Sequence, residues 1–361
     1  MASATGDRST KIGTLPLAAR SWEGMALRSL RPVRAGRAMT VVVPLSVLAA
    51  CLTTHAPTHT AEGALSPPSG SVAGPTSGPP PGPSTPTAPP AAPTPAIELP
   101  RGGRTIFPLH RLVGFCGTPG APALGELQGN LAVKAKALEA QAAHYSGEGR
   151  TLLPVFELIA VVVQTGPGPD GKYRHRVDDS VVDEYLRLAR KSKGLLLLNI
   201  QPGHSDFLTE VQSFETYLRE PDVGLALDPE WAMKPNQRPG VFYGQTTGEK
   251  VNEVAEYLSG LVEQGGLPEK ALVFHQVNRE VLKDEFAVKP YPGVAVIKSV
   301  DGLGPVGAKI ATYHNLMELR TPGVHPGFKL FFDEDRRNGS RLMTPTEVLA
   351  LSPQPEYVMY E

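Results

Sequence analysis

The triplet Asp228-Pro229-Glu230 directly follows a short apolar run and could carry acid–base chemistry. Residues i and i+2 of a strand point the same way, so both carboxyl groups could face one site. Neighbouring carboxylates raise each other's affinity for protons, so that one can remain a proton donor while the other is ionised. We therefore predict Glu230 as a catalytic acid and Asp228 as its partner. The alternative is a turn in which Asp228 only caps the next segment.

Glu157 lies inside the apolar run Val155-Phe156-Glu157-Leu158, where an unpaired carboxylate is costly. One interpretation is an ion pair with Lys298 or a hydrogen bond inside the fold. The other is a site carboxylate whose pKa is set by burial. We predict that Glu157 binds substrate, together with further polar and aromatic residues near the ends of apolar runs, namely Gln201, His275, Gln276, Trp231 and Asp333.

Short apolar runs alternate with amphipathic stretches from about residue 101 to residue 361. Most runs are apolar throughout, as is typical of parallel strands covered on both faces. The expected strands are Leu112–Cys116, Leu153–Leu158, Leu195–Ile200, Val223–Leu227, Ala271–His275, Val294–Lys298, Lys329–Phe332 and Tyr357–Tyr360. The expected helices are Leu131–His144, Asp179–Ser192, Phe207–Arg219, Val251–Val262 and Ala308–Leu319, with a further helix that Thr344 caps.

Eight strands separated by helices predict an α/β fold, namely a (β/α)8 TIM-like barrel, with an open doubly wound sheet as the alternative. No Gly-x-Gly-x-x-Gly follows the first expected strand, so a dinucleotide site is not indicated. In such a barrel the carboxyl ends of all strands meet at one mouth. The candidate residues should therefore converge there.

The Asp228-Pro229-Glu230 triplet resembles the Asp-x-Glu at the end of strand four in chitinase-like and Chalaropsis-type lysozyme barrels. The resemblance implies that Glu230 is the general acid and that Asp228 positions the substrate. The chitinase pattern has further acidic residues where this chain has Val223 and Ala226.

A wider resemblance, over nearly the whole region from residue 101, is to an uncharacterised family of secreted bacterial proteins, often lipoproteins, with a TIM-barrel domain. It rests on six blocks, which are Gly114–Pro119, Phe156–Ala160, Ala226–Glu230, Val273–Gln276, Gly327–Asp333 and Leu342–Leu349. This resemblance implies location and fold, and leaves the chemistry open.

The function expected from these features is glycoside-hydrolase-like action on a cell-envelope polysaccharide. One alternative is a non-catalytic carbohydrate- or wall-binding barrel, in which Trp231, Tyr243 and Phe115 form aromatic platforms for sugar rings. The other is a metal-dependent phosphodiesterase, whose ligands would come from Glu157, Asp228, Glu230, His204 and His275. Because no His-x-x-x-His or His-x-His spacing occurs after residue 100, we predict neither a metal nor a cofactor.

Residues 1–51 resemble a bacterial lipoprotein signal. Arginines at 28, 31, 34 and 37 precede an apolar stretch, Met39–Ala50, which is too short to span a bilayer, and Leu48-Ala49-Ala50-Cys51 follows as a lipidation box. The resemblance implies that Cys51 carries a lipid and that the protein is extracytoplasmic and membrane-anchored. Met25 or Met39 are alternative starts.

Residues 52–100 contain 14 prolines and only two charged side chains, Glu62 and Glu98. Such a segment has too little apolar surface to offset its ordering entropy, so we expect a disordered tether. Residues 101–361 would then form the barrel domain. The net charge of the chain is -1, which indicates no nucleic-acid partner, and we expect a monomer.

Overall fold

Eight apolar segments form a closed parallel barrel in the computed structural model, which describes residues 96–361. Each strand pairs in parallel with its neighbours, and β1 pairs with both β11 and β2, so the ring has no open edge. The predicted barrel is therefore confirmed, and the open sheet is not the fold. The strands are β1 (His110–Gly117), β2 (Thr151–Val163), β4 (Leu195–Ile200), β5 (Val223–Leu227), β7 (Lys270–Gln276), β9 (Val294–Val300), β10 (His325–Leu330) and β11 (Tyr357–Tyr360).

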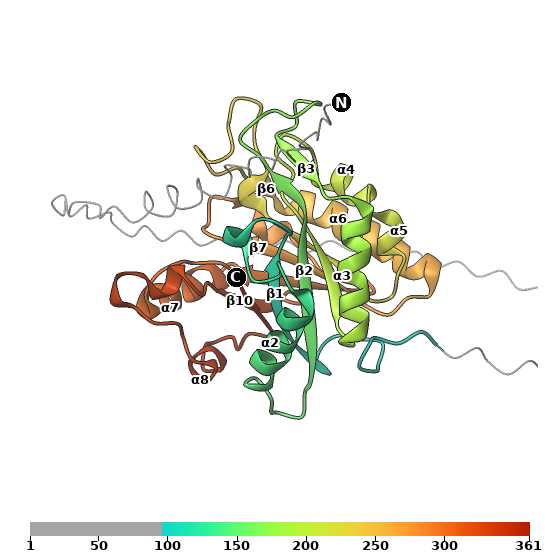
Figure 1. Cartoon of the computed structure of the whole chain (residues 1–361), viewed down its shortest axis with the longest axis vertical. Coiled ribbons are helices and arrows are strands. Elements are labelled where there is room, and N and C mark those ends of the chain that lie inside the picture. Colours follow the sequence, from blue (N-terminus) through green and yellow to red (C-terminus); the bar gives the residue numbers. More distant parts are fainter. Residues whose placement is uncertain (1–95) are drawn as a thin grey trace, which may run out of the picture. The chain divides into compact units, whose positions relative to one another are not determined.

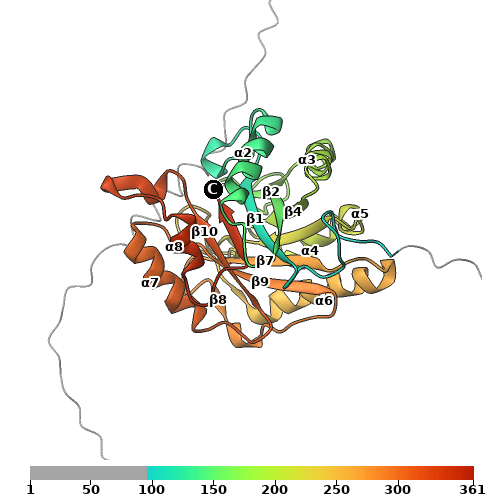
Figure 2. The same ribbon diagram turned by 90° about the horizontal axis from the view of Figure 1, so that it is seen from below.

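Helices surround the barrel strands, as Figure 2 shows from below. They are α2 (Leu131–Ala143), α3 (Asp179–Lys191), α4 (Phe207–Gln212), α5 (Glu215–Leu218), α6 (Gly248–Gly265), α7 (Val306–Met317) and α8 (Pro345–Leu349), with 3-10 turns η1 (Pro122–Leu124), η2 (Pro229–Trp231), η3 (Glu285–Ala287) and η4 (Glu334–Gly339). Within residues 96–361, no helix is long and apolar enough to cross a membrane.

Short strands occur in three of the connections (Figures 1 and 2). β3 (Arg174–Arg176) pairs antiparallel with the end of β2, and β6 (Thr246–Thr247) pairs with β8 (Leu282–Lys283) in a separate two-stranded sheet. The connection from β7 to β9 contains β8 and η3 in place of an α-helix. The barrel is thus regular in its strands and irregular in its connections.

Two expected elements differ in detail. The helix expected at Phe207–Arg219 is divided into α4 and α5, with Ser213 and Phe214 between them. The strand expected at Lys329–Phe332 instead runs from His325 to Leu330. Its first residues, His325-Pro326-Gly327, have low strand propensity, but they pair with β9 on one side and Gly327 also pairs with β11 on the other. Tertiary pairing overrides local propensity here.

Side chains alternate along each strand between the helices and the barrel interior. The interior-facing residues below the mouth form one buried apolar cluster, which we call the apolar interior: Leu112, Leu153, Val155, Leu195, Leu197, Ala226, Ala271, Val273, Ala295, Ile297 and Met359. A second, larger cluster lies between the strands and the helices. The interior is filled tightly, since a Cβ added to Gly114 would lie 2.9 Å from Met359 Cε.

Candidate active site at the mouth of the barrel

One polar residue from each barrel strand, or from the position just after it, lies at the carboxyl end of the barrel. Seven are at most 5% exposed, and Glu361 is partly exposed. Polar contacts join all eight in one continuous chain. We call this set the polar layer: Cys116, Glu157, Asn199, Asp228, His275, Asp301, Lys329 and Glu361.

His275 sits between two carboxylates near the middle of the polar layer. Its Nδ1 lies 2.9 Å from Asp301 Oδ2, and its Nε2 lies 3.0 Å from Glu157 Oε1. Burial disfavours the charged imidazole, but the carboxylates of Asp301 and Glu157 outweigh burial and hold the His275 pKa well above its ordinary value. The ring is therefore an imidazolium that donates one hydrogen bond to each side.

Glu157 is fully buried and fully hydrogen-bonded. Besides His275, its carboxylate accepts a hydrogen bond from Asn199 Nδ2 at 2.9 Å and from the Tyr357 hydroxyl at 2.8 Å. Burial raises the Glu157 pKa, but the charge and the hydrogen bond of His275 act in the opposite direction and outweigh it. The net shift of the Glu157 pKa is therefore downward. The expected ion pair with Lys298 is wrong, because Lys298 is bonded to Glu285 outside the barrel interior. Of the two bonding arrangements that the sequence suggests for Glu157, the hydrogen bonds inside the barrel are the ones that form.

Asp228 is held in place by two side-chain amides. Asn199 Nδ2 donates to Asp228 Oδ1 at 3.0 Å, and Gln201 Nε2 donates to Oδ2 at 3.0 Å. Gln201 is itself oriented, because its Oε1 accepts the backbone N–H of Val163. Burial raises the Asp228 pKa above its ordinary value, although His275 and Lys329 oppose this. The two amide donors favour the carboxylate form and fix its orientation.

Glu230 lies two residues after Asp228, in the turn η2, and is only 2% exposed. Its Oε2 has no hydrogen-bond partner among the described residues. Burial raises the Glu230 pKa well above its ordinary value, and the nearby carboxylates of Asp228 and Asp301 raise it further. Glu230 therefore keeps its proton to a higher pH than an ordinary glutamic acid, and the upward pKa shift of Asp228 beside it is smaller. A carboxyl group that retains its proton beside one that releases it more readily is a common basis of acid–base catalysis.

Lys329 and Glu361 close the other side of the polar layer. Lys329 Nζ lies 2.6 Å from Glu361 Oε2 and 3.4 Å from Asp301 Oδ2. The Cys116 thiol donates to Glu361 Oε2 at 3.4 Å. Burial and the Glu361 charge raise the Cys116 pKa well above its ordinary value, so this thiol is not a thiolate nucleophile.

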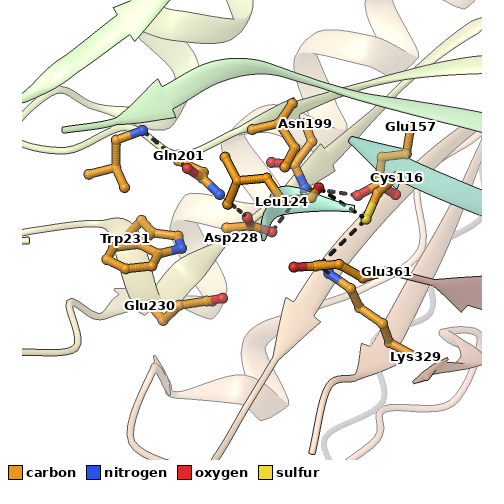
Figure 3. A pocket seen from close by; sticks show the side chains of 12 residues that line it. Cys116, Leu124, Glu157, Asn199, Gln201, Asp228, Glu230, Trp231, Lys329 and Glu361 are labelled. Atoms are coloured by element: carbon orange, nitrogen blue, oxygen red, sulfur yellow. Dashed lines mark hydrogen bonds and ion pairs between the residues drawn. The ribbon is translucent and has the colours of Figure 1, made fainter. Parts of the chain in front are cut away.

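A narrow pocket opens onto the polar layer (Figure 3). The carboxyl end of Glu230 points toward the middle of this pocket, on the side where Asp228 and Glu361 lie. The free space accommodates about one water molecule. The side chains that line it are Cys116, Leu124, Glu157, Ile159, Val163, Asn199, Gln201, Asp228, Glu230, Trp231, Lys329 and Glu361.

The structure brings five of the predicted site residues to the pocket wall and sets three elsewhere. Glu157, Gln201, Asp228, Glu230 and Trp231 line the pocket. His275 lies behind the wall, bonded to Glu157. Gln276 contacts Glu285 on the outer side of β7, and Asp333 is exposed before η4.

Sequence reasoning did not select Asn199, Asp301, Lys329, Tyr357, Cys116 or Glu361 for the site. Asn199, Asp301 and Lys329 do carry a signal, because each is a polar residue at or near the end of an apolar run. For Tyr357 and Glu361 the sequence offers none, since their partners lie 200 and 245 positions away. Strand parity on β1 would select Cys116, which shares a face with Leu112 and Gly114.

Of the five residues suggested for a metal site, Glu157, Asp228 and Glu230 line the pocket, and His275 lies behind its wall. In residues 96–361, no group of three or more His, Cys, Asp or Glu side chains is placed to hold a metal ion. His204 lies apart from the polar layer, where its Nε2 contacts the Gln237 carbonyl and its ring packs near Tyr173.

Comparisons with known proteins add no further assignment. No protein-family model matches the chain, and no curated protein sequence matches it.

Proposed function

We propose that this barrel is a glycoside hydrolase that acts on a cell-envelope polysaccharide. The observation that carries the proposal is Glu230, a buried carboxylic acid with one unpartnered oxygen in a pocket beside the amide-held Asp228. Glycoside hydrolysis requires such a pair, because one carboxyl group must donate a proton while the other stabilises positive charge or activates water.

In the proposed reaction, Glu230 donates its proton to the glycosidic oxygen as the bond from that oxygen to the sugar's anomeric carbon breaks. Asp228 faces the positive charge that develops on the sugar. A water molecule then bonds to the anomeric carbon through its oxygen and gives one proton to the Glu230 carboxylate, which restores the acid. Asn199 and Gln201 hold the Asp228 carboxylate, so little reorganisation is needed at this step. Because the pocket is narrow, the substrate inserts one group, and its remaining sugars lie at the mouth.

The test is Glu230→Gln, which keeps the shape of the side chain and removes its transferable proton. Turnover on wall polysaccharide should fall by roughly 10²- to 10⁴-fold, while binding persists. Glu184→Gln, on the exposed face of α3, is the matched control and should leave turnover unchanged. Unchanged turnover in a Glu230→Gln, Asp228→Asn double variant would remove the hypothesis.

A non-catalytic carbohydrate-binding barrel is the second candidate, and the small free volume of the pocket favours it. In that case the wild type should release no sugar from any wall polysaccharide. Trp231→Ala should then weaken binding, because this ring lines the pocket wall. A chelator that abolishes wild-type turnover would instead point to the metal-dependent alternative.

We propose further that a lipid on Cys51 anchors the protein outside the cytoplasm, with residues 52–100 as a tether. These residues lie outside the described part of the chain, so the support is the sequence pattern alone. Cys51→Ser should lose incorporation of a labelled fatty acid, because no other residue in the signal offers a thiol. Label retained by Cys51→Ser would contradict the anchor.

A further inference from the structure

The pocket has an excess of hydrogen-bond acceptors. Asn199 Oδ1 is buried without a partner among the described residues, and the Asp228 carboxylate accepts only one hydrogen bond at each oxygen, so both groups have acceptor capacity left at the pocket. Glu230 Oε2 also has no partner there, but in the protonated acid it can donate. The amide donors there are already used, since Asn199 Nδ2 bonds Glu157 and Asp228, and Gln201 Nε2 bonds Asp228. Unsatisfied buried acceptors cost about 1–3 kcal/mol each. The missing partner is therefore a donor.

The pocket also has an excess of carboxyl groups. Glu157, Asp228, Glu230 and Glu361 line it, whereas among residues 96–361 Lys329 is the only lysine, arginine or histidine that does so. Lys329 is already paired with Glu361 and Asp301, and His275 lies behind the wall between two carboxylates. A buried carboxyl group beside other carboxyl groups takes up either a proton or a cation. Since Glu230 takes up the proton, the Asp228 carboxylate beside it is the group that favours a cation, and the missing donor should carry positive charge.

The size of the free space restricts the donor further. It accommodates about one water molecule, and an –NH3⁺ group is of similar size and supplies three hydrogen-bond donors. A bare Ca²⁺ ion would need six to eight oxygen ligands, and the described residues show no such convergence. A primary ammonium group meets the requirements of donor number, charge and volume together.

We propose that the pocket recognises a primary ammonium group, with Asp228 and Asn199 Oδ1 as its principal acceptors. Resting on the proposed function, the substrate class is then a polysaccharide with unacetylated amino sugars. The ammonium group of such a sugar neighbours the anomeric carbon, so Asp228 can hold it while Glu230 meets the glycosidic oxygen. An N-acetyl group is larger than the free space and carries no charge.

The test compares three uncleavable, thio-linked glucosamine trisaccharides by titration calorimetry at pH 6 on the full chain. One has free amines, one is N-acetylated and one is N,N,N-trimethylated. We expect the free amine to bind at least about 10-fold more tightly than either of the others. The trimethyl compound keeps the positive charge of the amine, but it has no N–H donor and is larger. It therefore shows whether charge alone is enough for binding. Equal or tighter binding of the acetylated or trimethylated compound would overturn the proposal.

Asp228→Asn supplies a second measurement, since it removes charge and keeps shape. Affinity for the free amine should fall about 10- to 100-fold, while Glu184→Gln, an exposed charge on α3, should leave it unchanged. An unchanged affinity in a folded Asp228→Asn protein would overturn the assignment. If that variant does not fold, the wild-type ligand series decides alone.

The outcome is separable from that of the hydrolase proposal. Selective binding of the free amine without any turnover would retain the ammonium pocket and reject the hydrolase. Turnover that depends on Glu230 but shows no preference for free amines would retain the hydrolase and reject the ammonium pocket.

Discussion

The polar layer and the apolar interior are built from the same eight strands, yet they have opposite chemistry. On β4, Leu197 belongs to the apolar interior and Asn199, two residues on and on the same face, belongs to the polar layer. On β7, Val273 and His275 show the same change. Burial is nearly complete for all four of these residues, at both levels. Inside the ring of strands, the barrel thus keeps the charged groups of the polar layer at one end, where each has a neighbour in the same network.

Burial alone therefore does not predict how well a position tolerates substitution. In the apolar interior a polar group would have no partner, whereas in the polar layer an apolar group would leave partners unsatisfied. Removing one partner of a buried polar pair typically costs more than the pair itself contributes. Substitutions in the apolar interior and in the polar layer should therefore have different effects on stability and on binding.

The largest expected effect is that of Leu197→Asn. The new amide lies in the apolar interior without partners, and the leucine's apolar burial is lost. Together these should lower the free energy of unfolding by about 3–5 kcal/mol. Chemical denaturation of the barrel measures this directly.

The reciprocal change, Asn199→Leu, separates the two levels. It removes one donor each from Glu157 and Asp228, but adds apolar surface, so its stability cost should be smaller than that of Leu197→Asn. The same change should weaken ligand binding or turnover at the pocket, which Asn199 lines. A stability loss larger for Asn199→Leu than for Leu197→Asn would contradict the distinction.

The second expected effect is a pH dependence carried by His275. Its pKa is raised in the folded protein, so its contribution is fully present below pH 6.5 and is lost as pH rises toward the folded pKa. While the folded protein alone holds this proton, stability should fall by about 1.4 kcal/mol per pH unit from this residue. Urea titrations between pH 6.5 and 8.5 measure the slope.

Nuclear magnetic resonance of ¹⁵N-labelled histidine offers an independent check. The His275 ring should carry protons on both nitrogens to a higher pH than an ordinary histidine does, because Asp301 and Glu157 each accept a hydrogen bond from one ring nitrogen. A neutral imidazole at pH 7 would show that the charge arrangement of the polar layer is different.

The smallest expected effect is at Asp333, which the sequence suggests as a substrate-binding residue and which lies exposed outside the pocket wall. If the polar layer alone performs the chemistry, Asp333→Asn should change turnover less than about twofold and stability by less than about 0.5 kcal/mol. A larger loss of turnover would extend the functional region beyond the polar layer, toward the loop that follows β10.

The barrel could be predicted because the sequence pattern of an apolar run followed by a helix is repeated along the chain. Eight apolar runs with helical patterns between most of them leave few arrangements, and each run carries its own evidence. The split at Ser213–Phe214 and the early start of β10 at His325 could not be predicted, because pairing and packing decided them against local propensity.

The site was predictable only in part, for a different reason. Polar residues at the strand ends could be recognised in the sequence. However, consecutive residues of a strand face opposite sides of the barrel wall, so only some of these residues face the site. His275 therefore joins the polar layer while the adjacent Gln276 contacts Glu285 outside it. Lys298 and Lys329 are likewise both buried lysines on strands, and only Lys329 reaches the pocket. The partners of Glu157 depend on barrel closure, which no local pattern encodes.

The position of β11 between β10 and β1 has a consequence for how the site is made. This strand brings Tyr357 to Glu157 and precedes Glu361, whose contact with Cys116 joins positions 245 residues apart. Contacts of such long sequence separation form slowly, because the entropy of closing the loop must be overcome first. Until then, β1 and β10 each expose an unpaired edge. We therefore expect refolding chains to regain helix content early and binding capacity late, in a single step that closes the ring and completes the polar layer together.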